Sequence, residues 1–297
     1  MLEDAYADVN GIRLHYVTAG QPEQRPLVVF LHGFPEFWYA WKDQLTTFGA
    51  DYHAVAPDMR GYNLSSKPDA VEQYRVRHVV EDVRQLVTGL GHDRFILIGH
   101  DWGGAVAWAF ALSHPEMLDG LVVVNAPHPG VFARELRDNP AQQRASQYML
   151  MFRGPDAETT LASDDYATLF GLMVGWGEHR EWMAPEDRAV YRDAWSQPGA
   201  LTGGLNYYRA SGLGPPSGDA DRASAPTFDP NALVVRVPTL VIWGERDSAL
   251  LASNLDGLDS VVPVLTVKRV PDGSHWVVHE RPDLVNGYIR DFINKRV

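Results

Sequence analysis

The chain reads Phe95-Ile96-Leu97-Ile98-Gly99-His100-Asp101-Trp102-Gly103 where a buried strand is expected to turn sharply into a helix. The four apolar residues 95–98 are typical of such a strand, and residues 103–113 are typical of a helix. The glycines at positions 99 and 103 leave no side chain to obstruct a strained turn, and the start of a helix favours a negative charge. We therefore expect Asp101 to be ionised and accessible.

Asp101 stands at the nucleophile position of a Gly-x-nucleophile-x-Gly turn. A serine at this position would indicate an ordinary esterase. An aspartate instead attacks carbon through a carboxylate oxygen and leaves an ester on the enzyme. This chemistry suits substrates with an electrophilic alkyl carbon, such as epoxides and alkyl halides.

Composition limits the classes of partner. The 297 residues, 45% of them hydrophobic, suffice for one large α/β domain, with or without an insertion. The net charge of −12 disfavours nucleic acids and anionic membranes, and the absence of cysteine excludes disulfides and thiolate chemistry. Met1-Leu2-Glu3-Asp4 does not begin a signal peptide, and no apolar run is long enough to span a bilayer. We expect a cytoplasmic protein, compatible with a homo-oligomer, that binds neither nucleic acid nor membrane.

Strands and helices are expected to alternate along much of the chain. Strands are predicted at residues 5–9 and 13–17, joined by an Asn10-Gly11 turn, and at 26–31, 53–56, 95–98, 121–124, 238–243 and 264–267. Helices are predicted at residues 41–48, 78–89, 103–113 and 282–296. This order favours a mostly parallel sheet with right-handed crossovers, whose site lies at the carboxyl ends of the strands.

Residues 129–226 interrupt this alternation with helical periodicity and no buried-strand runs. Pro185, followed by two acidic residues, marks the start of one helix. Residues 212–230 are rich in Gly, Pro, Ser and Asp, as is typical of a linker. The sequence therefore predicts an α/β core of residues 1–128 and 227–297, with residues 129–226 inserted as a helical cap and return linker.

An ester on Asp101 requires a general base that activates water and an acid that orients the base. Asp247 follows one predicted strand and His275 follows the next, so both are expected at the same edge of the sheet as Asp101. The chain order nucleophile, acid, histidine is that of α/β hydrolases. We expect Asp247 to hold His275 neutral and oriented for attack on the ester by water.

The loop His32-Gly33-Phe34-Pro35 follows another predicted strand and is expected to complete an oxyanion hole. One backbone N–H would come from Phe34 and the other from Trp102, next to the nucleophile. Both would stabilise charge on the Asp101 carbonyl oxygen during attack by water. Pro35 donates no N–H and is a candidate for a cis peptide bond.

Several stretches together carry a resemblance to a known family. They are His32-Gly33-Phe34-Pro35-Glu36 with Trp38, residues 99–104, Asn125-Ala126-Pro127-His128-Pro129, and the loops that contain Asp247 and His275. On these residues the chain resembles the epoxide hydrolases of the α/β-hydrolase superfamily over nearly its whole length. The resemblance implies an α/β-hydrolase core with an inserted helical cap. It also implies conversion of a small apolar epoxide and water into a vicinal diol, with no cofactor and no metal.

The cap extends the resemblance. Epoxide hydrolases of this family protonate the epoxide oxygen with one tyrosine four residues before a phenylalanine and another within an Asn-aromatic-Tyr-Arg stretch. The matching stretches are residues 148–152 and 206–209, which imply that Tyr148 and Tyr208 are the donors. A phenol, with an unperturbed pKa of about 10, keeps its proton at neutral pH. Substrate contacts are expected from Trp38, Met149, Phe152 and Tyr207 in an apolar, adaptable pocket.

Dehalogenases are the main alternative, because they share the aspartate nucleophile. Haloacetate dehalogenases place arginines where this chain has Trp102 and Ala105, and His-Trp where it has Leu150-Met151. Haloalkane dehalogenases share Trp102, and Trp38 keeps that hypothesis open. A non-catalytic binding protein on the same fold is a third hypothesis, which turnover of an epoxide would exclude.

Two further hypotheses find little support. His275 and His279 have a spacing that metal sites use, but no third ligand stands at a recognisable distance, and Glu280 is expected to be a surface charge. The glycines from Gly99 to Gly104 lack the spacing of a dinucleotide-binding turn and the lysine of a phosphate-binding loop.

Overall fold

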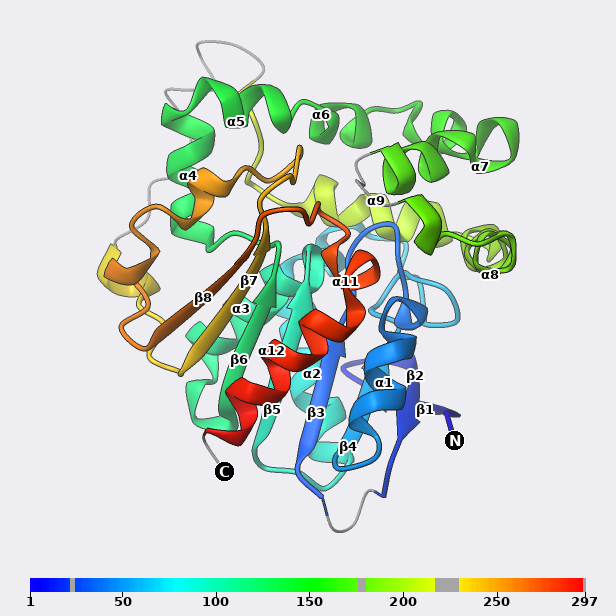
Figure 1. Cartoon of the computed structure of the whole chain (residues 1–297). Coiled ribbons are helices and arrows are strands. Elements are labelled where there is room, and N and C mark those ends of the chain that lie inside the picture. Colours follow the sequence, from blue (N-terminus) through cyan, green and yellow to red (C-terminus); the bar gives the residue numbers. More distant parts are fainter. Residues whose placement is uncertain (22–24, 176–179, 217–229, 296–297) are drawn as a thin grey trace.

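The computed structural model describes residues 1–21, 25–175, 180–216 and 230–295 (Figure 1). Within these ranges, eight strands form one sheet in the order β1-β2-β4-β3-β5-β6-β7-β8. The strands are β1 (Glu3–Val9), β2 (Ile12–Ala19), β3 (Leu27–Leu31), β4 (His53–Pro57), β5 (Phe95–His100), β6 (Leu118–Val124), β7 (Thr239–Gly244) and β8 (Leu265–Val270). The pairs β1/β2 and β2/β4 are antiparallel, and all pairs from β4 to β8 are parallel. This confirms the predicted α/β class.

The opening hairpin and the central strands follow directly from their residues. Asn10 and Gly11 both have positive φ, 47° and 76°, as a two-residue hairpin turn requires. In β3, Val28 and Phe30 join the core cluster on one face of the sheet, while the alternate residues join the cluster on the other. Because successive side chains point to opposite faces, a strand covered on both sides must be apolar throughout.

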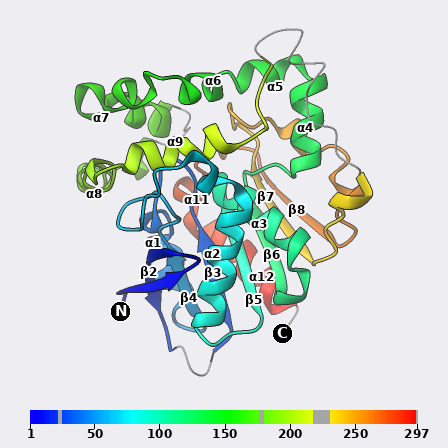
Figure 2. The ribbon, with the colours of Figure 1, turned by 180° about the vertical axis from the view of Figure 1, so that it is seen from behind.

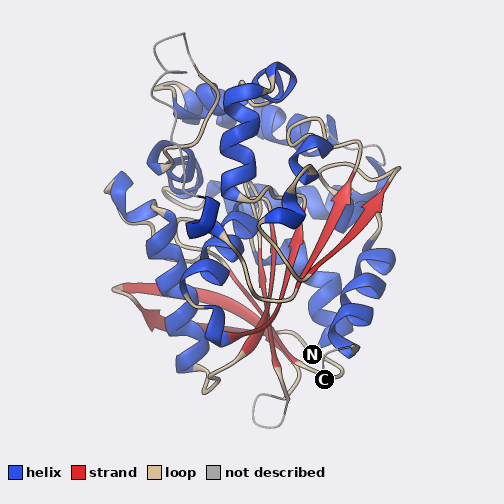
Figure 3. Cartoon of the chain, turned by 90° about the vertical axis from the view of Figure 1, so that its left-hand side faces the viewer, coloured by secondary structure: helices blue, strands red, loops and turns tan. Residues whose placement is uncertain are grey.

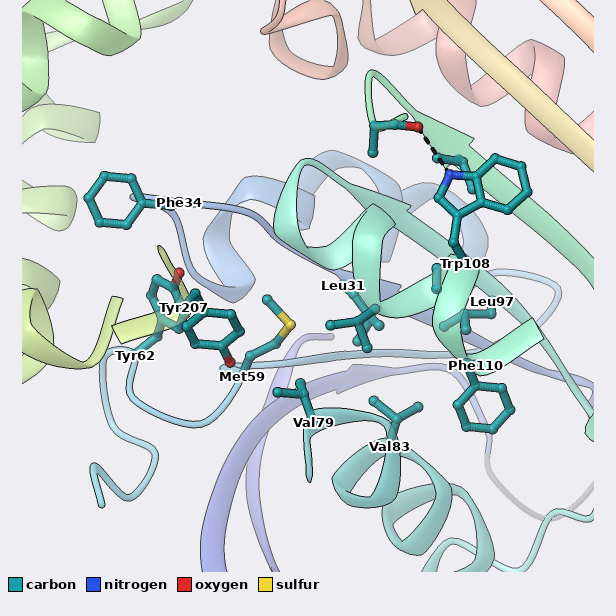
Figure 4. Close-up of a cluster of buried hydrophobic side chains, with 14 of the residues drawn as sticks. Leu31, Phe34, Met59, Tyr62, Val79, Val83, Leu97, Trp108, Phe110 and Tyr207 are labelled. Carbon is teal, nitrogen blue, oxygen red and sulfur yellow. Dashed lines mark hydrogen bonds between the residues drawn. The ribbon is translucent and has the colours of Figure 1, made fainter. Parts of the chain in front are cut away.

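Helices cover both faces of the sheet (Figures 2 and 3). They are α1 (Lys42–Phe48), α2 (Val76–Gly89), α3 (Trp102–Ser113), α11 (Val277–Glu280) and α12 (Pro282–Asn294). Side chains of α2 and α3 pack in one core cluster, and those of α1 and α12 in the other. Figure 4 shows part of the first cluster, where the Trp108 indole N–H donates to the carbonyl of Ala126 at 3.1 Å. This bond joins α3 to the end of β6.

The described residues between β6 and β7 form helices and no strand, as predicted. They are α4 (Pro129–Asp138), α5 (Pro140–Ala145), α6 (Tyr148–Arg153), α7 (Ala157–Gly175), α8 (Pro185–Ser196) and α9 (Ala200–Ala210). We call these six helices the cap, and Figure 1 shows them across the carboxyl ends of the parallel strands. The expected end of the insertion, residue 226, lies outside the described residues.

Some predicted boundaries were displaced. β6 begins three residues before the predicted start at Leu121, and β8 runs to Val270 instead of Val267. In β8 the signal was hidden by Lys268 and Arg269, charged residues of the kind that edge strands carry. α12 ends at Asn294, and its predicted last residue, Arg296, lies outside the described ranges. No helix among the described residues is long and apolar enough to cross a membrane.

Candidate active site

Asp101 lies in a strained turn between β5 and α3. Its backbone has φ 51° and ψ −120°, a conformation that non-glycine residues rarely adopt. A Cβ atom at Gly99 would lie 2.3 Å from the carbonyl oxygen of Gly103, and one at Gly103 would lie 2.1 Å from that of Leu31. Close backbone packing therefore requires both glycines, as the sequence predicted.

The two carboxylate oxygens of Asp101 have different surroundings. The backbone N–H of Phe34 donates to Oδ1 at 2.8 Å, and Oδ2 lies 3.7 Å from Nε2 of His275. Gly33 permits this approach, because a Cβ there would lie 2.4 Å from Oδ1. Trp102 begins α3, where the first N–H groups of a helix lack intrahelical acceptors. The Phe34-Pro35 peptide bond is cis.

Asp247 holds His275 from the side opposite Asp101. His275 Nδ1 and Asp247 Oδ2 are 2.7 Å apart, and both residues are almost fully buried. The other carboxylate oxygen, Oδ1, accepts hydrogen bonds from the backbone N–H groups of Ala249 and Leu250 at 2.9 and 2.8 Å. Since a carboxylate only accepts, Nδ1 carries the proton, and Nε2 is directed toward Asp101.

The electrostatics of His275 correct one expectation. Burial alone would lower the pKa of the imidazole, but the charge and hydrogen bond of Asp247 and the charges of Asp101 and Glu36 raise it to about 9. The free enzyme therefore holds His275 protonated at neutral pH, whereas the sequence led us to expect a neutral ring. The pKa reflects the sum of opposing burial and charge effects, which no local motif reveals.

Tyr148 of α6 and Tyr208 of α9 line the same cavity as Asp101. Their ring centroids are 6.2 Å apart, and both line a cavity of about 220 Å³ with Asp101 and Trp102. Burial and then the negative charge of Asp101 raise the pKa of both phenols well above 10. The two hydroxyl groups therefore keep their protons.

The rest of this cavity is almost entirely apolar. Its other described lining residues are Val76, Ala105, Ala109, Leu112, Pro127, Pro129, Phe132, Met149, Ser211, Leu213 and Leu250. Met149 thus lies where the sequence suggested a substrate contact.

The other three expected substrate contacts are not among the residues that line this cavity. Phe152 packs its ring against Phe34 and Tyr208, at centroid distances of 5.0 and 4.9 Å. The Tyr207 hydroxyl donates to the carbonyl of Arg60 at 3.0 Å. Trp38 donates its backbone N–H to Asp58 at 2.9 Å and does not line this cavity. These three residues therefore contact other protein groups instead of lining this cavity.

Glu36 is a buried carboxylate to which the sequence analysis gave no role. Its Oε1 accepts from Tyr191 of α8 at 2.8 Å and lies 2.6 Å from Nε2 of His279, while Oε2 lies 3.4 Å from Nδ1 of His100. Nε2 of His100 in turn donates to the carbonyl of His275 at 2.9 Å. Although burial opposes ionisation of Glu36, the charge of His279 and the hydrogen bonds of both histidines lower its pKa. Glu36 thus connects α8 of the cap with the loop that contains His275.

Two further polar residues support that loop. The expectation that Glu280 is a surface charge was wrong: it is buried and accepts from the backbone N–H and hydroxyl of Ser274 at 2.8 and 2.9 Å. Asn125 has a positive φ of 40° and donates its amide to Asp247 Oδ2 at 2.8 Å. Its place directly after a predicted strand was the only local signal for this role.

The histidine pair considered for metal binding is divided between two partners. His279 binds Glu36 and stacks on Trp182 at a centroid distance of 4.2 Å, whereas His275 faces Asp101 and Asp247. In the part of the chain that the structure describes, no group of three or more His, Cys, Asp or Glu side chains could hold a metal ion.

Comparisons with known proteins identify the family of this chain. A family model of the alpha/beta hydrolase fold matches residues 26–282. The AB hydrolase superfamily protein YfhM of Bacillus subtilis is 39% identical over 98% of both chains. Epoxide hydrolase 1 of Caenorhabditis elegans is 36% identical over 99% of this chain and 70% of its own length. The crystal structure of Bacillus megaterium epoxide hydrolase with an inhibitor superposes with a TM-score of 0.90, at 37% identity, covering 98% of this chain and 100% of that one. The chain therefore belongs to the α/β-hydrolase fold family, in the branch formed by the epoxide hydrolases.

Proposed function

We propose that this protein hydrolyses small apolar epoxides to vicinal diols through an ester on Asp101. The observation that carries the proposal is the unequal environment of the two Asp101 oxygens. Oδ1 is held by the Phe34 N–H, while Oδ2 is near His275 in a site that two neutral phenols also line. A carboxylate nucleophile and acid donors thus meet at one place, as ring opening requires.

In the first step, Oδ2 attacks a ring carbon and the carbon–oxygen bond of the epoxide breaks. The ring oxygen takes a proton from Tyr148 or Tyr208, so that the product is a hydroxyalkyl ester of Asp101. Esterification removes the carboxylate charge, which is one of the causes of the raised His275 pKa. The imidazole therefore releases its proton to solvent more easily once the ester exists, when a base is needed.

In the second step, His275 takes a proton from water, and the resulting hydroxide attacks the ester carbonyl. The N–H groups of Phe34 and Trp102 stabilise the tetrahedral oxyanion, and its collapse releases the diol and restores the carboxylate. The tyrosine recovers its proton from solvent, and the net reaction adds one water. In this proposal the nucleophile and the base come from residues 1–128 and 227–297. The acid donors come from the cap within residues 129–226. No metal or cofactor takes part.

The dehalogenase hypothesis is the weaker one. It rested on Trp102, which haloalkane dehalogenases share, and on Trp38, and of these two residues only Trp102 lines the cavity that contains Asp101. A halide also leaves as a stable anion and needs no proton, so dehalogenation would give the two phenols no role as donors. The intact Asp101, His275 and Asp247 geometry favours catalysis over ligand binding alone.

Trapping of the ester tests the proposal. His275→Gln removes the base but leaves Asp101 and the phenols, so incubation with styrene oxide is expected to add the mass of one epoxide to the intact protein. Asp101→Ala is expected to show no added mass and no turnover. An unmodified mass in the His275→Gln variant, with a substrate that the wild type hydrolyses, would overturn the ester mechanism.

A further inference from the structure

Helix α3 is buried on all sides except for one stripe. Apart from its last residue, the only members of α3 that retain solvent access are Trp102, Ala105, Ala109 and Leu112. Their spacing of three, four and three residues places them on a single helix face. All four line the cavity that contains Asp101. The accessible face of α3 is therefore the floor of this cavity.

The floor has a definite length. With a rise of 1.5 Å per residue, the stripe extends about 15 Å from Trp102, beside the nucleophile, to Leu112. Walls come from the cap at Phe132, from the chain after the cap at Leu213, and from the first residue of α2, Val76. The nucleophile thus lies at one end of a long apolar channel.

The middle of the floor consists of two small side chains, Ala105 and Ala109. Each adds only a methyl group, which leaves space above the helix between the larger Trp102 and Leu112. A hydroxyl group near the channel, that of Ser211, accepts the backbone N–H of Leu213 at 3.1 Å. The channel away from the nucleophile therefore favours hydrocarbon over polar substituents.

We propose that α3 selects epoxides by the length of a linear apolar substituent, which lies over Ala105 and Ala109 and extends toward Leu112. This inference rests on the proposed epoxide hydrolysis and names its substrate class: epoxides with a medium-length or long hydrocarbon arm. Ala109 lies about 12 Å along the helix from Asp101. It is the position at which a larger side chain stops a long arm but leaves room for a short one.

A series of terminal epoxides tests the proposal. For the wild type, kcat/KM is expected to rise from butene oxide through octene oxide to dodecene oxide, by up to about fourfold per methylene group. Ala109→Leu is expected to lower the value for dodecene oxide at least about tenfold more than the value for butene oxide. Leu112→Ala is expected to act in the opposite direction and favour the longest arm. Ser113→Leu, which introduces the same side chain at the exposed end of α3, is the control and is expected to leave the profile unchanged.

Binding of the corresponding diols, measured by calorimetry, separates this inference from the proposed reaction. Ala109→Leu is expected to weaken the longest diol and spare the shortest without any need for turnover. A length-dependent binding profile in a protein that hydrolyses no epoxide would overturn the proposed function and support the channel. Equal losses for short and long molecules, or an unchanged profile in both Ala109→Leu and Leu112→Ala, would overturn the channel.

Discussion

The core and the cap hold their functional groups in different ways. In the core, Asp247 accepts hydrogen bonds from two backbone N–H groups, from Asn125 and from His275. In the cap, Tyr148 and Tyr208 are surrounded by aromatic rings, both packing against Phe152. A buried charge requires fixed donors, because its desolvation is costly, whereas a phenol remains neutral in apolar surroundings. The core thus stabilises the charge of a buried carboxylate, whereas the cap keeps its two phenols protonated.

This contrast predicts the largest loss of activity for a change in the core. Asp247→Asn removes the charge that orients and stabilises the protonated imidazole, and kcat is expected to fall by about 10⁴, as in other triads. Rapid-quench kinetics should show the ester forming and then persisting. Glu245→Gln in the same loop, a partner of Arg269 on the surface, is the matched control and should retain activity. Normal hydrolysis of the ester in Asp247→Asn would remove Asp247 from the mechanism.

Substitutions in the cap are expected to cause a smaller loss of activity than substitutions in the core, and the loss should depend on the substrate. Replacing both Tyr148 and Tyr208 with phenylalanine removes the proton donors, and the rate of ester formation should fall by roughly 10² to 10⁴. Each single variant should lose less, because one donor remains. Tyr166→Phe, a cap tyrosine that packs on Trp195, serves as the control. Should the double variant react with epoxides at the wild-type rate, the two phenols would only shape the cavity.

The local motifs of the core could be predicted from sequence because each lies directly after a strand. Asp101, Asp247 and His275 follow β5, β7 and β8, and a parallel sheet brings the carboxyl ends of its strands to one edge. The two tyrosines were found only through family resemblance, since nothing in a helical cap fixes which aromatic residues face inward.

The supporting contacts could not be predicted, because they join distant parts of the chain. Glu36 and His279 are 243 positions apart, and Glu280 stands among polar residues typical of a surface. Residue type alone suggested substrate contacts for three aromatic residues, Trp38, Phe152 and Tyr207. Which aromatic residues line the cavity depends on how distant parts of the chain pack together, which no short pattern encodes.

The smallest predicted effect is a change in the pKa of His275 when the charge of Asp101 or Glu36 is removed. Asp101→Asn imitates the neutral ester, so the His275 pKa is expected to fall below about 9. Glu36→Gln should lower the same pKa less, because the charge of Glu36 is the weakest of the named causes. Since His275 acts as a base only when unprotonated, a lower pKa extends its action to lower pH. Titration of isotope-labelled histidine by NMR measures both shifts. An unchanged His275 pKa in Asp101→Asn would show that loss of the Asp101 charge on esterification does not make His275 easier to deprotonate.

Helix α8 has a consequence for the construction of chimeric enzymes. Its Tyr191 hydroxyl donates to Glu36 at 2.8 Å, and its Trp195 indole N–H donates to the carbonyl of Pro35 at 2.6 Å. Both acceptors directly follow Phe34, the residue whose N–H donates to Asp101. A cap transplanted from a relative would therefore bring its own hydrogen-bond donors to the loop of Phe34, Pro35 and Glu36. Exchanging caps to change substrate preference would alter catalytic power as well, unless these two donors are retained.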